Sequence, residues 1–454
     1  MGQKQSSTKS MDMTSGSIVK LLIAFSLPLL MGNIFQQLYN TVDSLVVGNF
    51  VGKEALAAVG STTPVINTLI TFFNGVSLGA TVIISRYFGA HNDERLHSAV
   101  ETTLALTFIS GVLCTIVGIY GAPWLLRFMD TPDDVLPSAS TYLRIYFAGV
   151  SGLLLYNMGS GILRAVGDTK RPLYFLIFSS IMNIVLDLLF VIAFNMGIAG
   201  VAYATIISQF VSAFMILFLL TKSKENYRFV WKDLRVDMSI VKMIFSIGLP
   251  AGLQQAITSF SNVYVQSYIN GFGSGCMAGW SSYSKIDSFV MLPMMSMGQA
   301  TTTFVSQNIG AGDLGRAKKG TNTSLIMSGA ISLAIATLLW FLAPQFAALF
   351  SQDSEVVSFC ILFLRQNIFF LAICCVTQVY SGTLRGVGNS TTPMIIMLCS
   401  YVAFRQVYLY IVKQVCYTPS LVGFGYPAGW MVCALLTTLY YWLSGWDKKL
   451  HIEH

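Results

Sequence analysis

Three carboxylic acids lie deep inside long apolar stretches of the sequence, where a charged side chain is costly: Asp43, Asp187 and Asp287. Asn183 precedes Asp187 by four residues, so a helix would place both on one face, and Thr205 lies in the next apolar stretch. Two close carboxylates in a low-dielectric setting cannot both ionise at low cost, which suits a proton carrier. The same oxygens would also suit Na⁺. Alternatively, each Asp is only a hydrogen-bonding partner between helices.

The amino-acid composition indicates the environment of these acids. The chain has 454 residues, of which 54% are hydrophobic and 10% are charged. Soluble domains carry about 25% charged residues, because polar groups must cover a surface that faces water. The sequence therefore excludes a soluble globular protein, a nucleic-acid-binding protein and a disordered chain. Lipid must cover most of the surface.

Apolar runs of about 20 residues predict helices that cross the bilayer. We expect twelve of them and an all-α integral membrane fold. The expected spans are 18–47, 55–86, 98–126, 137–163, 172–194, 198–221, 240–270, 278–307, 320–342, 357–384, 393–413 and 423–446.

Basic residues predict the orientation of these spans. Of the 27 Lys and Arg residues, 20 lie in the tails and in every second loop, with the densest group at 222–242. By the positive-inside rule, these segments and both termini are cytoplasmic. We therefore expect a multi-pass protein of the cell (cytoplasmic) membrane. The net charge of +7 needs no nucleic-acid partner to explain it.

The chain repeats itself at an offset of 221 or 222 residues. Pro28 matches Pro250, and the motif at 163–169 (LRAVGDT) matches that at 384–390 (LRGVGNS). One single-residue gap brings the halves into register, and each half holds six spans. We expect two pseudo-symmetric six-helix lobes at 18–221 and 240–446, a linker at 222–239, and cytoplasmic tails at 1–17 and 447–454. Duplicated polytopic folds of this kind favour transport by alternating access.

Residue counts from the helix ends predict that the polar residues of the first lobe lie at a similar depth in the membrane. Asp43 lies five residues before Gly48, Asp187 ten before Gly197, and Thr205 eight after Gly197. At 1.5 Å per residue, these side chains lie roughly 7–15 Å below the outer helix ends. We predict a cation-coupling cluster of Asp43, Asn183, Asp187 and Thr205 that binds H⁺ or Na⁺ and switches helix packing.

The second lobe carries isolated charges without such a cluster. Lys285 and Asp287 are two residues apart, about 200° around a helix, so they do not pair directly. Arg405 lies in the middle of its span and would balance a carboxylate. Lys285, Asp287 and Arg405 form a candidate cavity of the C-terminal lobe. In the first lobe, Tyr39 and Tyr142 suit a cavity for cationic molecules or ordinary helix packing.

These features resemble a known family over residues 15–445. The stretch from Pro28 to Asp43, the loop from Arg86 to Ala90, and LRAVGDT followed by Pro172 are similar to multidrug and toxic compound extrusion (MATE) transporters. The resemblance implies an antiporter that exports organic cations, drugs or metabolites by importing H⁺ or Na⁺. It implies coupling at Asp43, Asn183, Asp187 and Thr205, and a substrate cavity with Tyr39, Gln36, Tyr142 and Asn157.

Within that family, the sequence resembles the DinF-like branch. The NorM-like branch carries further carboxylates in helices 7 and 10, where this chain has Gln254, Gln255 and Gln378. We expect a monomer that needs no cofactor besides the coupling ion and takes a small, cationic amphipathic substrate. The alternative is a lipid-linked precursor flippase of the same wider superfamily. An enzyme is disfavoured because the four histidines lie in a cytoplasmic loop and at the C-terminus.

Overall fold

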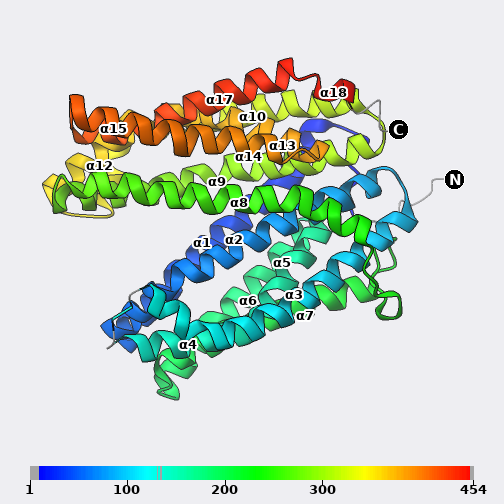
Figure 1. Cartoon of the computed structure of the whole chain (residues 1–454), viewed down its shortest axis with the longest axis horizontal. Coiled ribbons are helices and arrows are strands. Elements are labelled where there is room, and N and C mark those ends of the chain that lie inside the picture. Colours follow the sequence, from blue (N-terminus) through cyan, green and yellow to red (C-terminus); the bar gives the residue numbers. More distant parts are fainter. Residues whose placement is uncertain (1–9, 130, 133–134, 450–454) are drawn as a thin grey trace. The chain divides into compact units, whose positions relative to one another are not determined.

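The computed structural model describes residues 10–129, 131–132 and 135–449 (Figure 1). Within these residues the chain is helical and contains no β-strand, which confirms the all-α fold class. The first half contains α1 (Ile18–Val46), η1 (Val47–Val51), α2 (Lys53–Gly89), α3 (Asp93–Phe128), α4 (Leu136–Ala148), α5 (Val150–Ala165), α6 (Lys170–Leu188), η2 (Leu189–Ala193) and α7 (Gly197–Lys222).

The second half follows the short helix η3 (Trp231–Asp233) and repeats this order. It contains α8 (Met238–Asn270), α9 (Ser274–Gly310), α10 (Leu314–Phe341), α11 (Ala343–Ala348), α12 (Ser354–Asn367), η4 (Ile368–Phe370), α13 (Leu371–Val387), α14 (Thr391–Met397), η5 (Leu398–Phe404), α15 (Arg405–Val415), α16 (Pro419–Gly423), α17 (Gly425–Leu443) and α18 (Trp446–Lys449).

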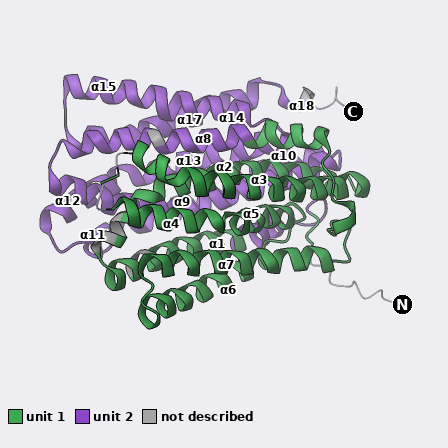
Figure 2. Ribbon diagram, turned by 60° about the horizontal axis from the view of Figure 1, so that its bottom comes forward, with its two compact units in different colours: residues 1–12, 28–248 green, residues 13–27, 249–454 purple. Residues whose placement is uncertain are grey.

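The chain divides into two compact units (Figure 2). The first comprises residues 1–12 and 28–248, and the second comprises residues 13–27 and 249–454. They differ from the expected lobes, 18–221 and 240–446, mainly at the first helix of each half. In the first unit, a Cβ on Gly79 of α2 would clash with the carbonyl oxygen of Ile244 in α8. Backbone contact between α2 and the start of α8 therefore explains why residues 238–248 belong to this unit.

Ten helices among the described residues are long and apolar enough to cross a membrane, and a bent pair adds an eleventh. That pair, α4 and α5, is bent by 48° and corresponds to the expected span 137–163. Its break falls at Gly149, between the two helices. The repeat places the short 3₁₀ turn η4 at the equivalent point of the span that joins α12 to α13. Both halves therefore interrupt their fourth span at the same place.

The remaining expected span, 278–307, forms the long helix α9, but its residues are more polar than those of the other spans. Many of its polar residues are buried, including Thr301, Ser306, Gln307 and Asn308. The helix packs against α10, α12 and α13, which cover these polar residues. Thr301 donates to the carbonyl oxygen of Met297 at 2.8 Å, which satisfies a buried hydroxyl inside the helix itself.

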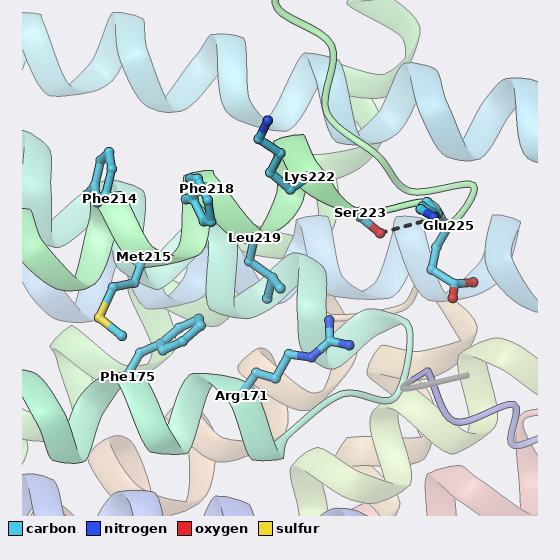
Figure 3. Close-up of a pocket in the computed structure, with 10 residues that line it drawn as sticks. Arg171, Phe175, Phe214, Met215, Phe218, Leu219, Lys222, Ser223 and Glu225 are labelled. Atoms are coloured by element: carbon cyan, nitrogen blue, oxygen red, sulfur yellow. Dashed lines mark hydrogen bonds between the residues drawn. The ribbon is translucent and has the colours of Figure 1, made fainter. Parts of the chain in front are cut away.

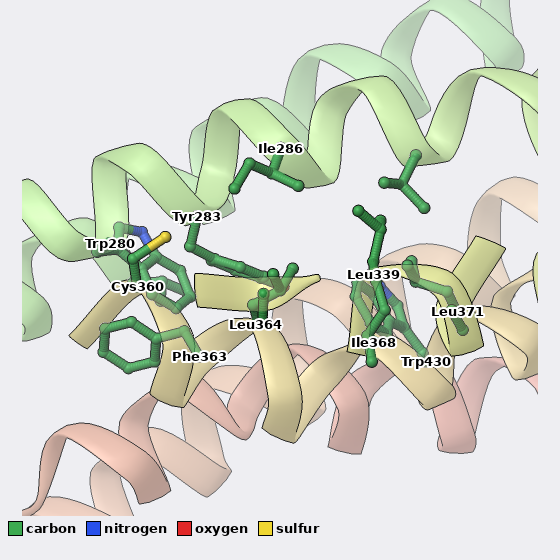
Figure 4. Packing of buried hydrophobic residues seen from close by; sticks show 14 of the residues in the cluster. Trp280, Tyr283, Ile286, Leu339, Cys360, Phe363, Leu364, Ile368, Leu371 and Trp430 are labelled. Atoms are coloured by element: carbon green, nitrogen blue, oxygen red, sulfur yellow. The ribbon is translucent and has the colours of Figure 1, made fainter. Parts of the chain in front are cut away.

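Each unit has its own apolar core. In the second unit, Trp280 and Tyr283 of α9 pack against Phe363 of α12, with Leu371 and Trp430 in the same cluster (Figure 4). The outer helix faces are apolar too: Tyr120 and Trp124 of α3 are 81% and 69% exposed. Such a large exposed apolar surface belongs in a bilayer.

Three π-helical segments interrupt the spans within the described residues, and two of them closely follow the predicted site residues Asp43 and Asp187. η1 starts four residues after Asp43, and η2 starts two residues after Asp187. Pro28 and Pro250 differ by 222 positions, whereas the helix-starting glycines Gly52 and Gly273 differ by 221. The first half therefore has one extra residue in this stretch. A π-bulge absorbs one inserted residue, and η1 accounts for the gap between the repeats.

Candidate functional site

Helix α6 presents its polar residues to the protein and its apolar residues outward. Asn183 and Asp187 are both 0% exposed, one helical turn apart. On the opposite face, Ile181 and Val185 are more than half exposed. An amphipathic helix in a membrane orients in this way because lipid accepts the apolar face and the bundle interior must take the carboxylate.

The Asn183 side chain joins α6 to α7. With its amide nitrogen facing the carboxylate, it donates to Asp187 Oδ2 at 3.1 Å, and its oxygen accepts from the Thr205 backbone N–H at 3.2 Å. The Thr205 hydroxyl donates to the carbonyl oxygen of Val201 at 3.0 Å. The amide thus fixes the position of one oxygen of Asp187.

The two acids meet in the interior of the first unit. The Asp43 carboxyl from α1 interacts directly with that of Asp187. Oδ1 of Asp43 and Oδ1 of Asp187 are buried, and neither has a hydrogen-bonding partner among the described residues. We call Asp43, Asn183, Asp187 and Thr205 the acidic cluster. It leaves two buried carboxylate oxygens ready to accept a proton or a cation.

Tyrosine rings from α1 and α4 surround the acidic cluster. The Tyr39 phenol lies beside Thr205 and Asp43, and Tyr142 lies near both acids. Tyr142 stacks on Tyr146 with ring centroids 6.4 Å apart. Tyr146 in turn lies next to Gln209 of α7, whose side-chain oxygen is buried without a hydrogen-bonding partner.

Sequence reasoning missed Tyr146 and Gln209. Both follow a predicted residue by four positions, Tyr146 after Tyr142 and Gln209 after Thr205. The same one-turn spacing that pairs Asn183 with Asp187 would have found them. The predicted cavity residues Gln36 and Asn157 are different. Gln36 is exposed and Asn157 is half-buried, and we find no hydrogen bond between either side chain and the acidic cluster within the described chain.

The second unit does not bring its three predicted charges together. Lys285 is exposed, with its Nζ 5.9 Å from the Phe350 ring centroid. Asp287, on another face of α9, accepts a long hydrogen bond of 3.5 Å from the Tyr283 hydroxyl. The angular separation expected from their spacing explains this divergence.

Arg405 is almost completely buried, at 3% exposed, and is held by neutral groups. Its Nη2 donates to Ser261 Oγ at 2.8 Å and to Asn262 Oδ1 at 2.9 Å, and its guanidinium lies 4.7 Å from the Tyr426 ring centroid. We call Ser261, Asn262, Arg405 and Tyr426 the arginine cluster. In the described part of the chain, Arg405 forms no ion pair with a carboxylate. Tyr426 also lies near Asp287, so the two charges approach the same ring.

Similar proteins support the fold and the repeat. The MatE family profile matches twice, over residues 28–189 and 250–411, once in each half. The probable multidrug resistance protein YoeA of Bacillus subtilis is 30% identical over 441 residues, covering 95% of both chains. The probable multidrug resistance protein NorM of Thermotoga maritima is 25% identical over 443 residues, covering 95% of this chain and 94% of that protein.

A solved structure agrees in detail. It is described as the outward-facing conformation of a multidrug resistance MATE family transporter of the MOP superfamily. It superposes with a TM-score of 0.91 at 27% identity, covering 98% of this chain and 100% of the other. A duplicated multi-pass helical bundle with buried acids defines a membrane transporter. The chain belongs to the MatE family, which confirms the resemblance seen in the sequence. The assignment to the DinF-like branch stays a prediction.

Proposed function

We infer that this protein is a proton-coupled antiporter that exports small, cationic amphipathic molecules by alternating access. One observation carries the coupling step: Asp43 and Asp187 face each other, and each keeps a buried oxygen without a partner. A proton shared between two such oxygens removes their mutual repulsion, and its loss restores that repulsion. Protonation therefore changes the packing of α1 against α6 and α7.

The amide orientation favours H⁺ over Na⁺. A hard cation needs a shell of several oxygen ligands. The oxygen of Asn183 accepts from the Thr205 N–H, and its nitrogen faces Asp187, so the side of this amide nearest the carboxylates carries an N–H donor that cannot ligate a cation. A Na⁺ ion would have the two free carboxylate oxygens and nearby hydroxyls. A proton needs only the two carboxylates.

The relatives YoeA and NorM support export of drugs, because both are named probable multidrug resistance proteins. The rings of Tyr39, Tyr142 and Tyr146 beside the acids supply faces that attract organic cations. We place the protein in the cell membrane with both termini cytoplasmic, following the distribution of its basic residues.

The flippase alternative is less well supported. A carrier of lipid-linked phosphates would need several cations open to its substrate. Arg405, the deeply placed cation of the second unit, is instead enclosed and bonded to Ser261 and Asn262.

The test is efflux from proteoliposomes under a pH gradient or a Na⁺ gradient imposed separately. We expect uphill efflux with the pH gradient alone and loss of that efflux in Asp43→Asn and in Asp187→Asn. Glu94→Gln is the matched control, because it removes an exposed carboxylate from the first turn of α3. Full activity of both Asp variants would overturn the coupling mechanism, and efflux driven only by Na⁺ would overturn the choice of ion.

A further inference from the structure

A groove lies on the first unit where the start of α6 meets the end of α7 (Figure 3). It encloses about 540 Å³. Arg171 and Phe175 line it from α6, and Phe214, Phe218 and Lys222 line it from α7. We call it the α6–α7 groove. Because α6 begins and α7 ends there, the groove lies at one face of the membrane, the face that carries the basic linker.

The end of the groove that lies farther from the basic linker is apolar, and its aromatic rings are exposed on the outer surface of the unit. Phe214 and Phe218 are 66% and 55% exposed and stack with ring centroids 6.0 Å apart. Phe175 lies opposite them on α6, with Met215 between (Figure 3). Both helices turn apolar faces to the bilayer here, so a hydrocarbon chain is the natural neighbour of this wall.

The other end of the groove is cationic. Arg171, Lys222 and Lys224 line it together with one acid, Glu225, and Asp168 pairs with Arg171 beside the groove, so three cations and two acids leave an excess of one positive charge. Asp168 Oδ2 holds the Nε edge of Arg171 at 3.1 Å, and the Arg171 guanidinium extends toward Leu219 (Figure 3). Lys222 and Lys224 are both exposed. A guanidinium held by a carboxylate, beside two exposed ammonium groups, is a good receptor for a phosphate.

We propose that the α6–α7 groove binds an anionic glycerophospholipid from the leaflet on the basic side. The headgroup phosphate meets Arg171, Lys222 and Lys224, and one acyl chain lies along Phe175, Phe214 and Phe218. A free phosphate would leave the aromatic wall unused, and a neutral lipid would leave the excess positive charge uncompensated. Basic pockets between helices at the cytoplasmic membrane face bind lipid headgroups on the same physical grounds.

Binding of a fluorescent phosphatidylglycerol to the delipidated full-length protein in detergent tests the headgroup contact. We expect phosphatidylglycerol to bind more tightly than phosphatidylcholine, and its affinity to fall with salt. Lys222→Gln/Lys224→Gln should weaken binding roughly thirtyfold, since each Lys near an anionic lipid contributes about a factor of five. Lys232→Gln/Lys242→Gln is the matched control, because it removes two exposed lysines outside the groove. This control should bind like the wild type.

Two further arms test the acyl contact. Phe214→Ala/Phe218→Ala should also weaken binding, whereas Phe178→Ala/Phe210→Ala removes exposed aromatic rings outside the groove and should not. Glycerol 3-phosphate should not displace the lipid. Equal binding of the two lipids, wild-type affinity in the Lys222/Lys224 variant, or displacement by glycerol 3-phosphate would each overturn the proposal.

Discussion

The acidic cluster and the arginine cluster occupy equivalent places in the two repeats, yet their chemistry is opposite. At an offset of 222, Asp43 corresponds to Val265, which is fully buried in the apolar core of the second unit. At 221, Thr205 corresponds to Tyr426. The second unit therefore has an aliphatic side chain at the position of Asp43 and an aromatic ring at the position of Thr205.

The fifth span of each half sharpens the contrast. The buried positions are Asn183 and Asp187 in the first half, and Arg405 and Leu409 in the second. They differ by 222, whereas Pro172 and Pro393 differ by 221. The π-helix η5, directly before Arg405, absorbs the additional residue. One repeat thus places an amide beside a free acid, and the other places a guanidinium beside a leucine.

The two repeats share one scaffold but have acquired different electrostatic properties. A pair of buried acids without a resident cation must take its positive charge from solution, so its state follows an ion gradient. A buried Arg held by Ser261 and Asn262 carries its charge permanently. The first unit is therefore the responsive one, and the second keeps one charge state throughout the cycle.

Giving the first unit the aliphatic residues of the second should have the largest effect on transport. In Asp43→Val/Asp187→Leu, we expect gradient-driven efflux in proteoliposomes to fall to the level of empty vesicles. The free energy of unfolding should change by no more than about 1–3 kcal/mol, since the variant removes two carboxyls that are costly to bury but leaves the Asn183 amide without its acceptor on Asp187. Thermal unfolding in detergent checks the second part. Retained efflux would show that the acids do not couple transport.

Removing the resident cation should have a smaller, structural effect. Arg405→Met removes the two hydrogen bonds from the buried guanidinium to Ser261 and Asn262, at a cost of about 1–3 kcal/mol in the free energy of unfolding. The pH dependence of efflux should match that of the wild type. A well-folded Arg405→Met that has lost its response to the pH gradient would place the arginine cluster in the coupling machinery.

Asp287→Asn should reduce the free energy of unfolding by less than Arg405→Met does. Its hydrogen bond from Tyr283 is long, and an Asn oxygen keeps an acceptor for that hydroxyl. We expect a change in unfolding free energy of about 1 kcal/mol or less, and efflux within roughly twofold of the wild type. Comparison with Asp187→Asn in the same assay separates the two units. Equal losses in both variants would contradict the asymmetry.

The smallest effect is expected for Lys285→Ala. The ammonium group is exposed and 5.9 Å from the Phe350 ring centroid, a contact that contributes about 0.5–1 kcal/mol at an exposed site. Efflux and its pH dependence should not change. A strong loss of transport would show that Lys285 contacts substrate in another state of the cycle.

Much of this architecture is readable from the sequence because lipid imposes long apolar helices and the repeat supplies their number. The meeting of Asp43 with Asp187 is also readable, because helix rise converts residue counts into depth. Side-chain direction is harder to predict. Lys285 and Asp287 share a depth but point to different neighbours, and only the packing around α9 decides which of them is enclosed.

The π-helical segments are a second feature that is hard to predict from the sequence. A sequence alignment at offset 221 puts Ile184 opposite Arg405, whereas the buried faces match Arg405 with Asn183. A bulge moves the register by one residue without an obvious signal such as Pro or Gly. The burial of the polar residues of α9 is equally hard to predict, because an apolar run does not reveal which helix the other helices cover.

The extra residue in η1 acts as a rotational setting for α1. Each residue of an α-helix advances its direction by about 100°, so an inserted residue that no bulge absorbed would turn everything before it relative to everything after it. Forcing Val47–Val51 into a regular α-helix without removing a residue would leave every side chain of the acidic cluster unchanged. It would nevertheless swing Asp43 about a quarter turn away from Asp187 if the far end of the span stayed in place. The coupling pair thus depends on helical phase as much as on the identity of its two acids.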